Sequence, residues 1–286
     1  MDEHISLHIG GLTDIGNRRQ NNEDAWWAGR PGGEHLFMET GAGPLQLDPR
    51  AGPVLLVVSD GVGGASAGEV ASRMAVTIIT ETLRNATGAL VLARSAGVTL
   101  LEAVRAAHAG ILAKAAEPGF DGMGATLSLL SFGSDGAACW AQAGDSRIYL
   151  CRDGHLRQIS RDHSPVGRLR QQGLITEEEA RQHPQRNQID LSLGDLVNPF
   201  EPDTGVEETR PGDVILLCSD GLSDGLWDRE IQQILAGVGT PDAVLPAVRE
   251  LVAGAKRASG RDNITAVAAL VHGGAGQPGR WRRLFH

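Results

Sequence analysis

The 286-residue sequence has few cysteines and no long apolar run. Its cysteines, Cys139, Cys151 and Cys218, are odd in number and lie in or beside apolar segments. This predicts buried free thiols in a reducing compartment and excludes a disulfide framework. No apolar run approaches the ~20 residues that a membrane-spanning helix needs, and residues 1–4 do not resemble a signal peptide. We therefore expect a soluble, cytoplasmic protein without a membrane span.

Basic residues are in the minority, since 26 Lys and Arg against 35 Asp and Glu give a net charge of −9. This acidity disfavours nucleic acid as the main partner. Two phosphate-binding signatures are also missing. The sequence has no GxxxxGK[ST] motif, and the GxGxxG pattern that starts at Gly61 fails because Ser66 occupies its last glycine position. Neither kind of nucleotide-binding loop is indicated.

What the sequence does have is a strand, an acidic residue, a glycine-rich turn and a helix in succession. Val54–Val58 is typical of a strand buried on both faces, and Asp60 stands where that strand ends. A helix is expected from Ser66, with Glu69 completing a capping box. Gly61 allows the backbone carbonyl to approach whatever the carboxylate binds. Taken alone, Asp60 could equally be a simple turn residue.

A second copy of the pattern favours a functional site. Residues 213–225 again place an apolar run before Ser-Asp-Gly, with the carboxylate at Asp220 and Asp224 four residues beyond. Three further acidic sites stand in similar settings, at Glu23 with Asp24, at Asp145 and at Asp262. Such acidic clusters without a matching set of His or Cys predict a site for a hard cation with oxygen ligands.

The ordered motifs resemble the metal-dependent protein phosphatases of type 2C, and most closely their bacterial serine/threonine branch. The resemblance extends from about Leu7 to Val271. In chain order the motifs are Arg19…Asn22-Glu23-Asp24, Asp60-Gly61-x-Gly63-Gly64-x-x-x-Gly68-Glu69, Gly124-Ala-Thr126, Gly144-Asp145-Ser146-Arg147, Asp162-His163-Ser164, Ser219-Asp220-Gly221-Leu222 and Asp262-Asn263. Each motif alone is weak, whereas the ordered set is highly specific.

The resemblance implies an α+β fold, a four-layer αββα sandwich whose two central antiparallel β-sheets are flanked by helices. It implies a phosphatase domain over residues 1–272 with a mobile flap at about 160–196, and residues 273–286 are expected to form a flexible C-terminal tail. Residues 29–53 are expected to form a hairpin with an extended loop, and Thr176 to cap a short helix. Other strands are expected at 7–13, 124–132, 137–142, 147–152 and 262–271, and helices at 66–84, 98–116, 228–235 and 241–255.

The resemblance also assigns ligands for two core metal ions, Mn²⁺ or Mg²⁺. In this assignment the Asp60 carboxylate bridges both ions and the Gly61 carbonyl binds one of them. Asp220 and Asp262 bind the other ion. A pair of divalent cations can activate water, orient a phosphate and stabilise the charge that develops on it, which is what hydrolysis of a phosphomonoester requires.

Four more carboxylates belong to the periphery of the predicted site. Glu23 and Asp24 are expected to hold metal-bound waters, with occasional direct contact. Asp145 and Asp224 match a looser site for a possible third ion. Thr126 and Asn263 are expected to brace the metal ligands through hydrogen bonds. Arg147 is expected to form a structural ion pair in its turn, and His163 to cap or stabilise a loop.

Arg19 matches the arginine that clamps the phosphate, because a guanidinium can bond two phosphoryl oxygens at once. Arg18 lies one position away, and the spacing to Asn22-Glu23-Asp24 favours Arg19. Arg19 and Asp60 are therefore the predicted catalytic residues. Val62 stands where eukaryotic members often have a histidine that is proposed as a general acid. This leaves protonation of the leaving group to metal-bound water.

The sequence thus predicts a phosphoserine and phosphothreonine protein phosphatase that opposes a bacterial Ser/Thr protein kinase and acts as a monomer. Two alternatives stay open, a catalytically inactive interaction module on the same fold and a phosphatase of small phosphorylated metabolites. The presence of each expected ligand argues against the inactive module. The metabolite phosphatase is not excluded, since a metal site binds the phosphate group and does not recognise the rest of the substrate.

Overall fold

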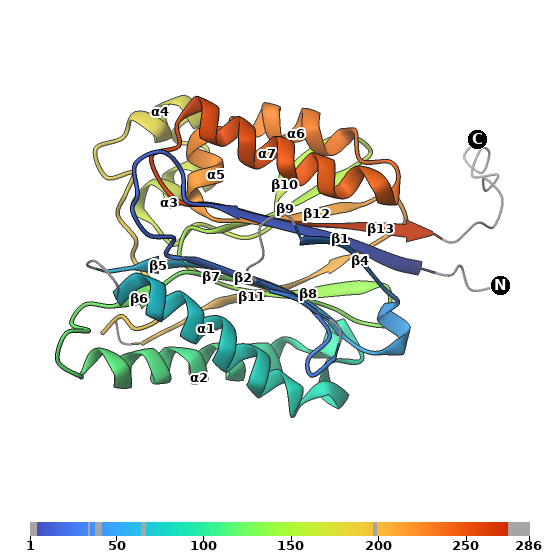
Figure 1. Cartoon of the computed structure of the whole chain (residues 1–286), viewed down its shortest axis with the longest axis horizontal. Helices are drawn as coiled ribbons and strands as arrows, with labels where there is room; N and C mark the ends of the chain where they lie inside the picture. Colours follow the sequence, from blue (N-terminus) through green and yellow to red (C-terminus); the bar gives the residue numbers. More distant parts are fainter. Residues whose placement is uncertain (1–4, 34, 38–41, 64–66, 197–198, 274–286) are drawn as a thin grey trace.

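Two antiparallel β-sheets pack face to face, and helices cover both of their outer faces (Figure 1). This computed structural model describes residues 5–33, 35–37, 42–63, 67–196 and 199–273. The predicted cap at Ser66 and nearly all of the predicted tail lie outside these ranges. The predicted four-layer αββα sandwich is confirmed.

The first sheet, sheet A, has the strand order β10-β9-β12-β13-β1-β4. Its strands are β1 (Ile5–Asp14), β4 (Ala42–Leu47), β9 (Arg147–Arg152), β10 (His155–Gln158), β12 (Val214–Cys218) and β13 (Ile264–Gly273). Sheet B has the order β11-β8-β7-β5-β2-β3, and β6 pairs with β5. Its strands are β2 (Asp24–Gly29), β3 (His35–Phe37), β5 (Val54–Val62), β6 (Gly124–Ala125), β7 (Leu127–Phe132), β8 (Ala137–Ala143) and β11 (Asp203–Glu208).

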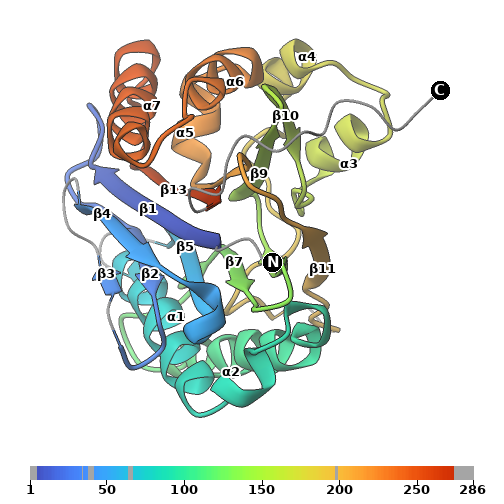
Figure 2. The ribbon, with the colours of Figure 1, turned by 90° about the vertical axis from the view of Figure 1, so that its right-hand side faces the viewer.

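The helices divide between the two outer faces and the flap (Figure 2). Helices α1 (Ala67–Arg84) and α2 (Gly97–Ala115) cover sheet B. Helices α5 (Asp220–Gly225), α6 (Asp228–Ala236) and α7 (Val244–Ala258) cover sheet A. The flap carries α3 (Pro165–Gln171) and α4 (Glu177–Gln182), and Thr176 with Glu179 forms the predicted capping box. In the described ranges, no helix is long and apolar enough to cross a membrane.

Continuous apolar strands hold the layers together. In β5, Leu55 and Val57 pack in the cluster that includes α1 and α2, whereas the alternate residues of Val54–Val58 pack in the cluster between the sheets. The same alternation separates Trp27 from Trp26 on β2. Because side chains of a strand point alternately to opposite faces, a strand inside a four-layer sandwich is apolar on both. The three cysteines are buried and free, as predicted.

Three predicted boundaries are wrong. Residues 29–53 are not one hairpin, because β3 pairs with β2 in sheet B while β4 crosses over to pair with β1 in sheet A. Strand β5 does not end before Asp60 but continues to Val62, since Asp60 pairs with Asp24 and Gly61 with Ala125. Strand β13 runs to Gly273, one residue into the predicted tail.

Strand β11 and helices α3 and α5 were not predicted. The edge strand β11 has a polar sequence of alternately half-buried and exposed residues, so it lacks the apolar run that marks a buried strand. The helix α5 begins at Asp220 itself, where the sequence predicted only the end of a strand. Helix α5 places Asp220 and Asp224 on one helical turn, four residues apart.

Candidate active site

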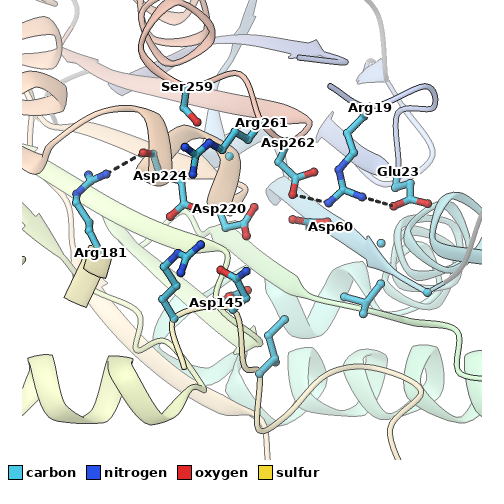
Figure 3. Close-up of a pocket in the computed structure, with 17 residues that line it drawn as sticks. Arg19, Glu23, Asp60, Asp145, Arg181, Asp220, Asp224, Ser259, Arg261 and Asp262 are labelled. Carbon is cyan, nitrogen blue, oxygen red and sulfur yellow. Dashed lines mark hydrogen bonds and ion pairs between the residues drawn. The ribbon is translucent and has the colours of Figure 1, made fainter. Parts of the chain in front are cut away.

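Acidic side chains from both sheets converge on one cavity of about 430 Å³ (Figure 3). Asp60 belongs to β5 and Asp145 to the turn after β8, so both come from sheet B. Asp220 follows β12 and Asp262 precedes β13, so both come from sheet A. The cavity-lining carboxylates are Glu23, Asp60, Asp145, Asp220, Asp224 and Asp262. Residues that are up to 239 positions apart in the chain thus share one cavity.

Asp24 lies behind this cavity and does not line it. Its side chain is almost fully buried, and its Oδ2 accepts hydrogen bonds from Ser219 Oγ at 2.7 Å and Thr265 Oγ1 at 2.6 Å. Its Oδ1 has no partner among the described residues. Burial raises the pKa of Asp24 to about 6 despite these hydrogen bonds. This position suits a carboxylate that acts on a cation through water.

Gly61 lies where the fold leaves no room for a side chain. A Cβ at this position would be 2.1 Å from the carbonyl oxygen of Gly68, in the first turn of α1, and 2.8 Å from that of Glu23. The Gly61 amide also donates to the Glu23 carbonyl at 3.1 Å. The glycine therefore lets three backbone segments meet at the edge of the cavity.

Two neutral side chains brace the acidic residues, as predicted. Thr126 accepts a hydrogen bond from the Asp60 amide at 3.0 Å through Oγ1, which is also hydrogen-bonded to Ser146 Oγ at 2.5 Å. Thr126 thereby links β5 to the turn of Asp145. Asn263 accepts from the Glu23 amide at 2.8 Å. Its amide group donates to the carbonyls of Ile15 and Asn21, each at 3.0 Å, which fixes the loop that carries Arg19.

Crowding of the carboxylates opposes their ionisation. Burial, followed by the charges of Asp24 and Asp220, raises the pKa of Asp60 well above its ordinary value. Burial and the nearby Asp145 do the same to the pKa of Asp220. Burial and the charge of Asp162 raise the pKa of Asp145 to about 7. Divalent cations would offset the repulsion within such a cluster, because a cation favours the ionised form of each carboxylate.

The donor chemistry fits a hard divalent cation. The cavity offers carboxylate oxygens, and Oδ1 of Asp220 is buried with no hydrogen-bond partner in the described part of the chain. Within the same ranges, no three His, Cys, Asp or Glu side chains already have the spacing that could hold an ion. The carboxylates repel one another, and Asp262 is drawn to Arg19, whose Nη2 donates to Asp262 Oδ2 at 2.6 Å. Asp262 is thus paired with a cationic side chain of the protein itself.

Arg19 stands at the edge of the cavity with its side chain about half exposed, 47%. Besides Asp262, it faces Glu23, with Nη1 at 3.8 Å from Oε2 (Figure 3). These two acidic neighbours raise its pKa further, the hydrogen bond to Asp262 contributing most. Arg147, by contrast, forms the predicted structural ion pair, with Nη2 at 2.7 Å from Asp162 Oδ2.

Sequence reasoning missed a group of cavity-lining residues from the flap and from the segment before β13. They are Arg181, Arg186, Asn187, Ile189, Ser259 and Arg261. Arg181 also attaches the flap to the end of α5, because it donates to the carbonyls of Ser223 at 2.6 Å and Asp224 at 2.8 Å. No local pattern marks these residues. Only the proximity of Arg261 to Asp262 in the sequence was a usable signal.

A protein-family model described as Protein phosphatase 2C matches residues 46–263. The chain belongs to the protein phosphatase 2C family. Protein phosphatase PhpP of Streptococcus pneumoniae is 35% identical over 268 residues, which cover 91% of this chain and 95% of PhpP. Serine/threonine protein phosphatase PstP of Mycobacterium tuberculosis is 40% identical over 268 residues, which cover 93% of this chain but 45% of PstP.

The fold agrees with that assignment. The crystal structure of the PstP catalytic domain in complex with two manganese ions superposes with a TM-score of 0.72 at 33% identity, covering 94% of this chain and 99% of that one. This 2C-family chain is therefore a metal-dependent serine/threonine protein phosphatase of the bacterial branch.

Proposed function

We propose that this 2C-family phosphatase hydrolyses phosphoserine and phosphothreonine in proteins at the cavity built around Asp60. The observation that carries the proposal is the convergence of carboxylates from both sheets on one cavity with Arg19 at its edge. Two divalent ions, Mn²⁺ or Mg²⁺, would supply charge neutralisation and an activated water when bound. The residues of the chain supply the ligands, the phosphate clamp and the surface that receives the substrate.

In this proposal the ligands divide by position. Asp60 is shared between the two ions, Gly61 offers its carbonyl to one, and Asp220 and Asp262 hold the other. Glu23 and Asp24 act mainly through water. This fits the placement of Asp24 behind the cavity and its unpartnered Oδ1.

Asp145 and Asp224 would hold a third ion more loosely. Both line the cavity beside Asp220 (Figure 3). Asp224 lies on the exposed edge, whereas Asp145 is recessed, so the pair has one ligand that water can reach. An ion held by one recessed and one exposed carboxylate is expected to exchange faster than an ion bridged by Asp60.

Arg19 would clamp the phosphate. When a cation takes over Asp262, the guanidinium loses its strongest partner and can donate two parallel hydrogen bonds to phosphoryl oxygens. Val62 supplies no proton, so the leaving alkoxide must be protonated by water in the cavity.

The flap, about residues 160–196, would choose among phosphopeptides. Arg186, Asn187 and Ile189 line the cavity together with the acidic residues. A small aryl phosphate can reach the acidic residues without touching these three, whereas a peptide on either side of the phosphorylated residue cannot. We further propose that the phosphatase domain ends with β13 at Gly273, and that the protein acts as a cytoplasmic monomer in signalling against a Ser/Thr kinase.

The deciding experiment is Mn²⁺-dependent release of phosphate from a phosphothreonine peptide, compared with a phosphotyrosine peptide and a sugar phosphate. We expect Asp60→Asn to reduce turnover more than ~100-fold. Changing an outer partner of a metal ligand typically costs 10–100-fold, and Asp60 is the shared ligand. Asp153→Asn, in an exposed turn, is the matched control. Equal rates on the sugar phosphate, or wild-type rates for Asp60→Asn, would refute the proposal.

A further inference from the structure

His163 lies at the start of the flap and contacts the turn between β8 and β9. Its ring accepts a hydrogen bond at Nδ1 from the amide of Gly144 at 3.1 Å. Its own amide donates to the carbonyl of Gly144 at 2.9 Å. One residue of the flap therefore holds both backbone polar groups of Gly144, the residue that directly precedes Asp145.

His163 also contacts the far end of the flap. Its carbonyl accepts from the amide of Asp190 at 2.7 Å. Its Nε2 lies 3.2 Å from Oδ2 of Asp203, the first residue of β11, and the side chain of His163 is only 15% exposed. Arg161 donates to both oxygens of Asp203, at 2.8 and 2.7 Å. These contacts require the tautomer that accepts at Nδ1 and donates at Nε2.

We propose that His163 is a positioning residue that fastens both ends of the flap to the turn carrying Asp145. We call its contacts with Gly144, Asp190 and Asp203 the His163 latch. The latch makes the position of Asp145 depend on whether the flap is closed. The role of Asp145 in holding a third cation rests on the proposed function, whereas the latch itself does not.

The turn needs such a restraint. Gly144 has a φ of +97°, and a Cβ there would lie 2.7 Å from Cβ of Thr126, so the turn takes a conformation that other residues disfavour. After Asp145, the carbonyl of Ser146 accepts from Gln142 Nε2 at 2.6 Å. Asp145 is thus held on its C-terminal side by sheet B, against the repulsion of the neighbouring carboxylates. On its N-terminal side the latch makes the shorter contacts with Gly144, and Gln142 Nε2 adds a longer one of 3.4 Å to the Gly144 carbonyl.

A second attachment of the flap makes the latch testable. Arg181 fastens α4 to the end of α5 and touches neither Gly144 nor Asp203. If the flap were held by α4 alone, loosening His163 would leave both the flap and the turn in place. If the latch operates, loss of the side-chain contact between His163 and Gly144 must loosen the turn and the flap together.

Two variants of His163 separate the halves of the latch. In His163→Asn the side-chain oxygen falls near the position of Nδ1, so it can still accept from Gly144 while the contact with Asp203 is lost. In His163→Gln the amide can reach toward Asp203 while the acceptor for Gly144 is lost. His183→Gln is the matched control, because this flap histidine accepts only a local hydrogen bond from the Gln185 amide, at 3.2 Å.

The first measurement is amide hydrogen exchange of the full chain in excess chelator. We expect His163→Gln to speed exchange about tenfold or more in both the 143–147 turn and the 161–190 flap. His163→Asn should speed exchange mainly in the flap, and His183→Gln in neither segment. Faster exchange of the flap with an unchanged turn in His163→Gln would overturn the latch, and so would exchange in both segments like that of the wild type.

The second measurement is calorimetric titration of each variant with Mn²⁺ alone. His163→Gln should weaken the loosest phase about tenfold and leave the tight phases unchanged, with His163→Asn closer to the wild type. A wild type that lacks a loose phase would refute the third-ion assignment, but the exchange result would still decide the latch. If His163→Gln does not fold, the turn and flap of His163→Asn decide instead: a turn that loosens as much as the flap would overturn the proposal.

Discussion

Arg19 connects cation binding to phosphate binding, because the same guanidinium that pairs with Asp262 is the proposed clamp. We expect Arg19→Ala to raise KM for a phosphopeptide about 10–100-fold with a smaller change in kcat. This corresponds to the loss of charge-assisted hydrogen bonds worth roughly 1.5–3 kcal/mol in ground and transition states alike. Steady-state kinetics and inhibition by inorganic phosphate measure the effect.

The matched control is Arg73→Ala, on the exposed side of α1, whose guanidinium pairs with Glu69 at 3.0 Å. A fall in kcat with unchanged KM for Arg19→Ala would place the interaction in the transition state alone and contradict the clamp. A similar rise in KM for Arg73→Ala would instead report a general effect of lost positive charge.

Asp145 gives the metal-free protein a pH dependence of stability. Its pKa in the folded state is raised to about 7, whereas an unfolded Asp titrates near 4. Between these values the folded state binds more protons than the unfolded state, so this group lowers the free energy of unfolding as pH rises. We expect Asp145→Asn to remove that contribution, which amounts to at most about 1.4 kcal/mol per pH unit.

Urea unfolding of wild type and Asp145→Asn in excess chelator, at pH 5 and pH 7.5, measures this difference. The variant should gain stability relative to the wild type at the higher pH. A difference between the two proteins that is the same at both pH values would mean that Asp145 ionises normally.

Among the elements, the flap is the one whose side chains should set the preference among phosphopeptides without affecting hydrolysis itself. Its attachments include His163, Arg181 and the ion pair of Arg170 with Asp228. It contributes Arg186, Asn187 and Ile189 to the cavity lining. We expect replacement of these three cavity residues by alanine to alter kcat/KM ratios among phosphothreonine peptides about tenfold, with aryl phosphate hydrolysis nearly unchanged. Removal of residues 274–286 should leave both activities unchanged.

Phosphothreonine peptides and an aryl phosphate, each assayed on the triple alanine variant and on the protein without residues 274–286, distinguish the flap from the tail as the source of selectivity. Peptide preference that follows the tail and not the flap contradicts the proposed role of the flap. An equal loss on both substrates would mean that the flap residues act on the chemistry, through Asp145 or Asp224, and not on recognition.

At the scale of the whole molecule, the proposed cation site joins the two sheets. Asp60 and Asp145 belong to sheet B, whereas Asp220 and Asp262 belong to sheet A. Ions that bind only the folded protein should therefore raise the free energy of global unfolding by about 2.7 kcal/mol for each site at a hundred times its Kd, and with it the unfolding temperature. Thermal unfolding with and without Mn²⁺ tests this, and Asp60→Asn should abolish most of the shift while Asp153→Asn preserves it.

The sequence by itself determined most of the strands and helices and the acidic motifs, whereas the four layers were predicted from the resemblance to a family. Apolar runs such as Val54–Val58 predict buried strands. Alternate side chains of a strand point to opposite faces, and when both faces are buried every residue in the run is apolar. The helices over 67–84 and 97–115 followed from composition within a residue or two. The acidic residues stood out because each follows or precedes such a strand, and their order matched one family.

Only the tertiary structure decided how these pieces meet. Pairing in the sheets carried β4 into sheet A, extended β5 through Asp60 and placed Asp24 behind the cavity. Arg181 and Arg186 reach the cavity only because the flap folds back over α5, and a polar segment of this kind has no periodicity that predicts its contacts. Local patterns report which face of an element is apolar. Contacts between residues more than a hundred positions apart depend on the packing of the whole sandwich, and the shape of the site is made of such contacts.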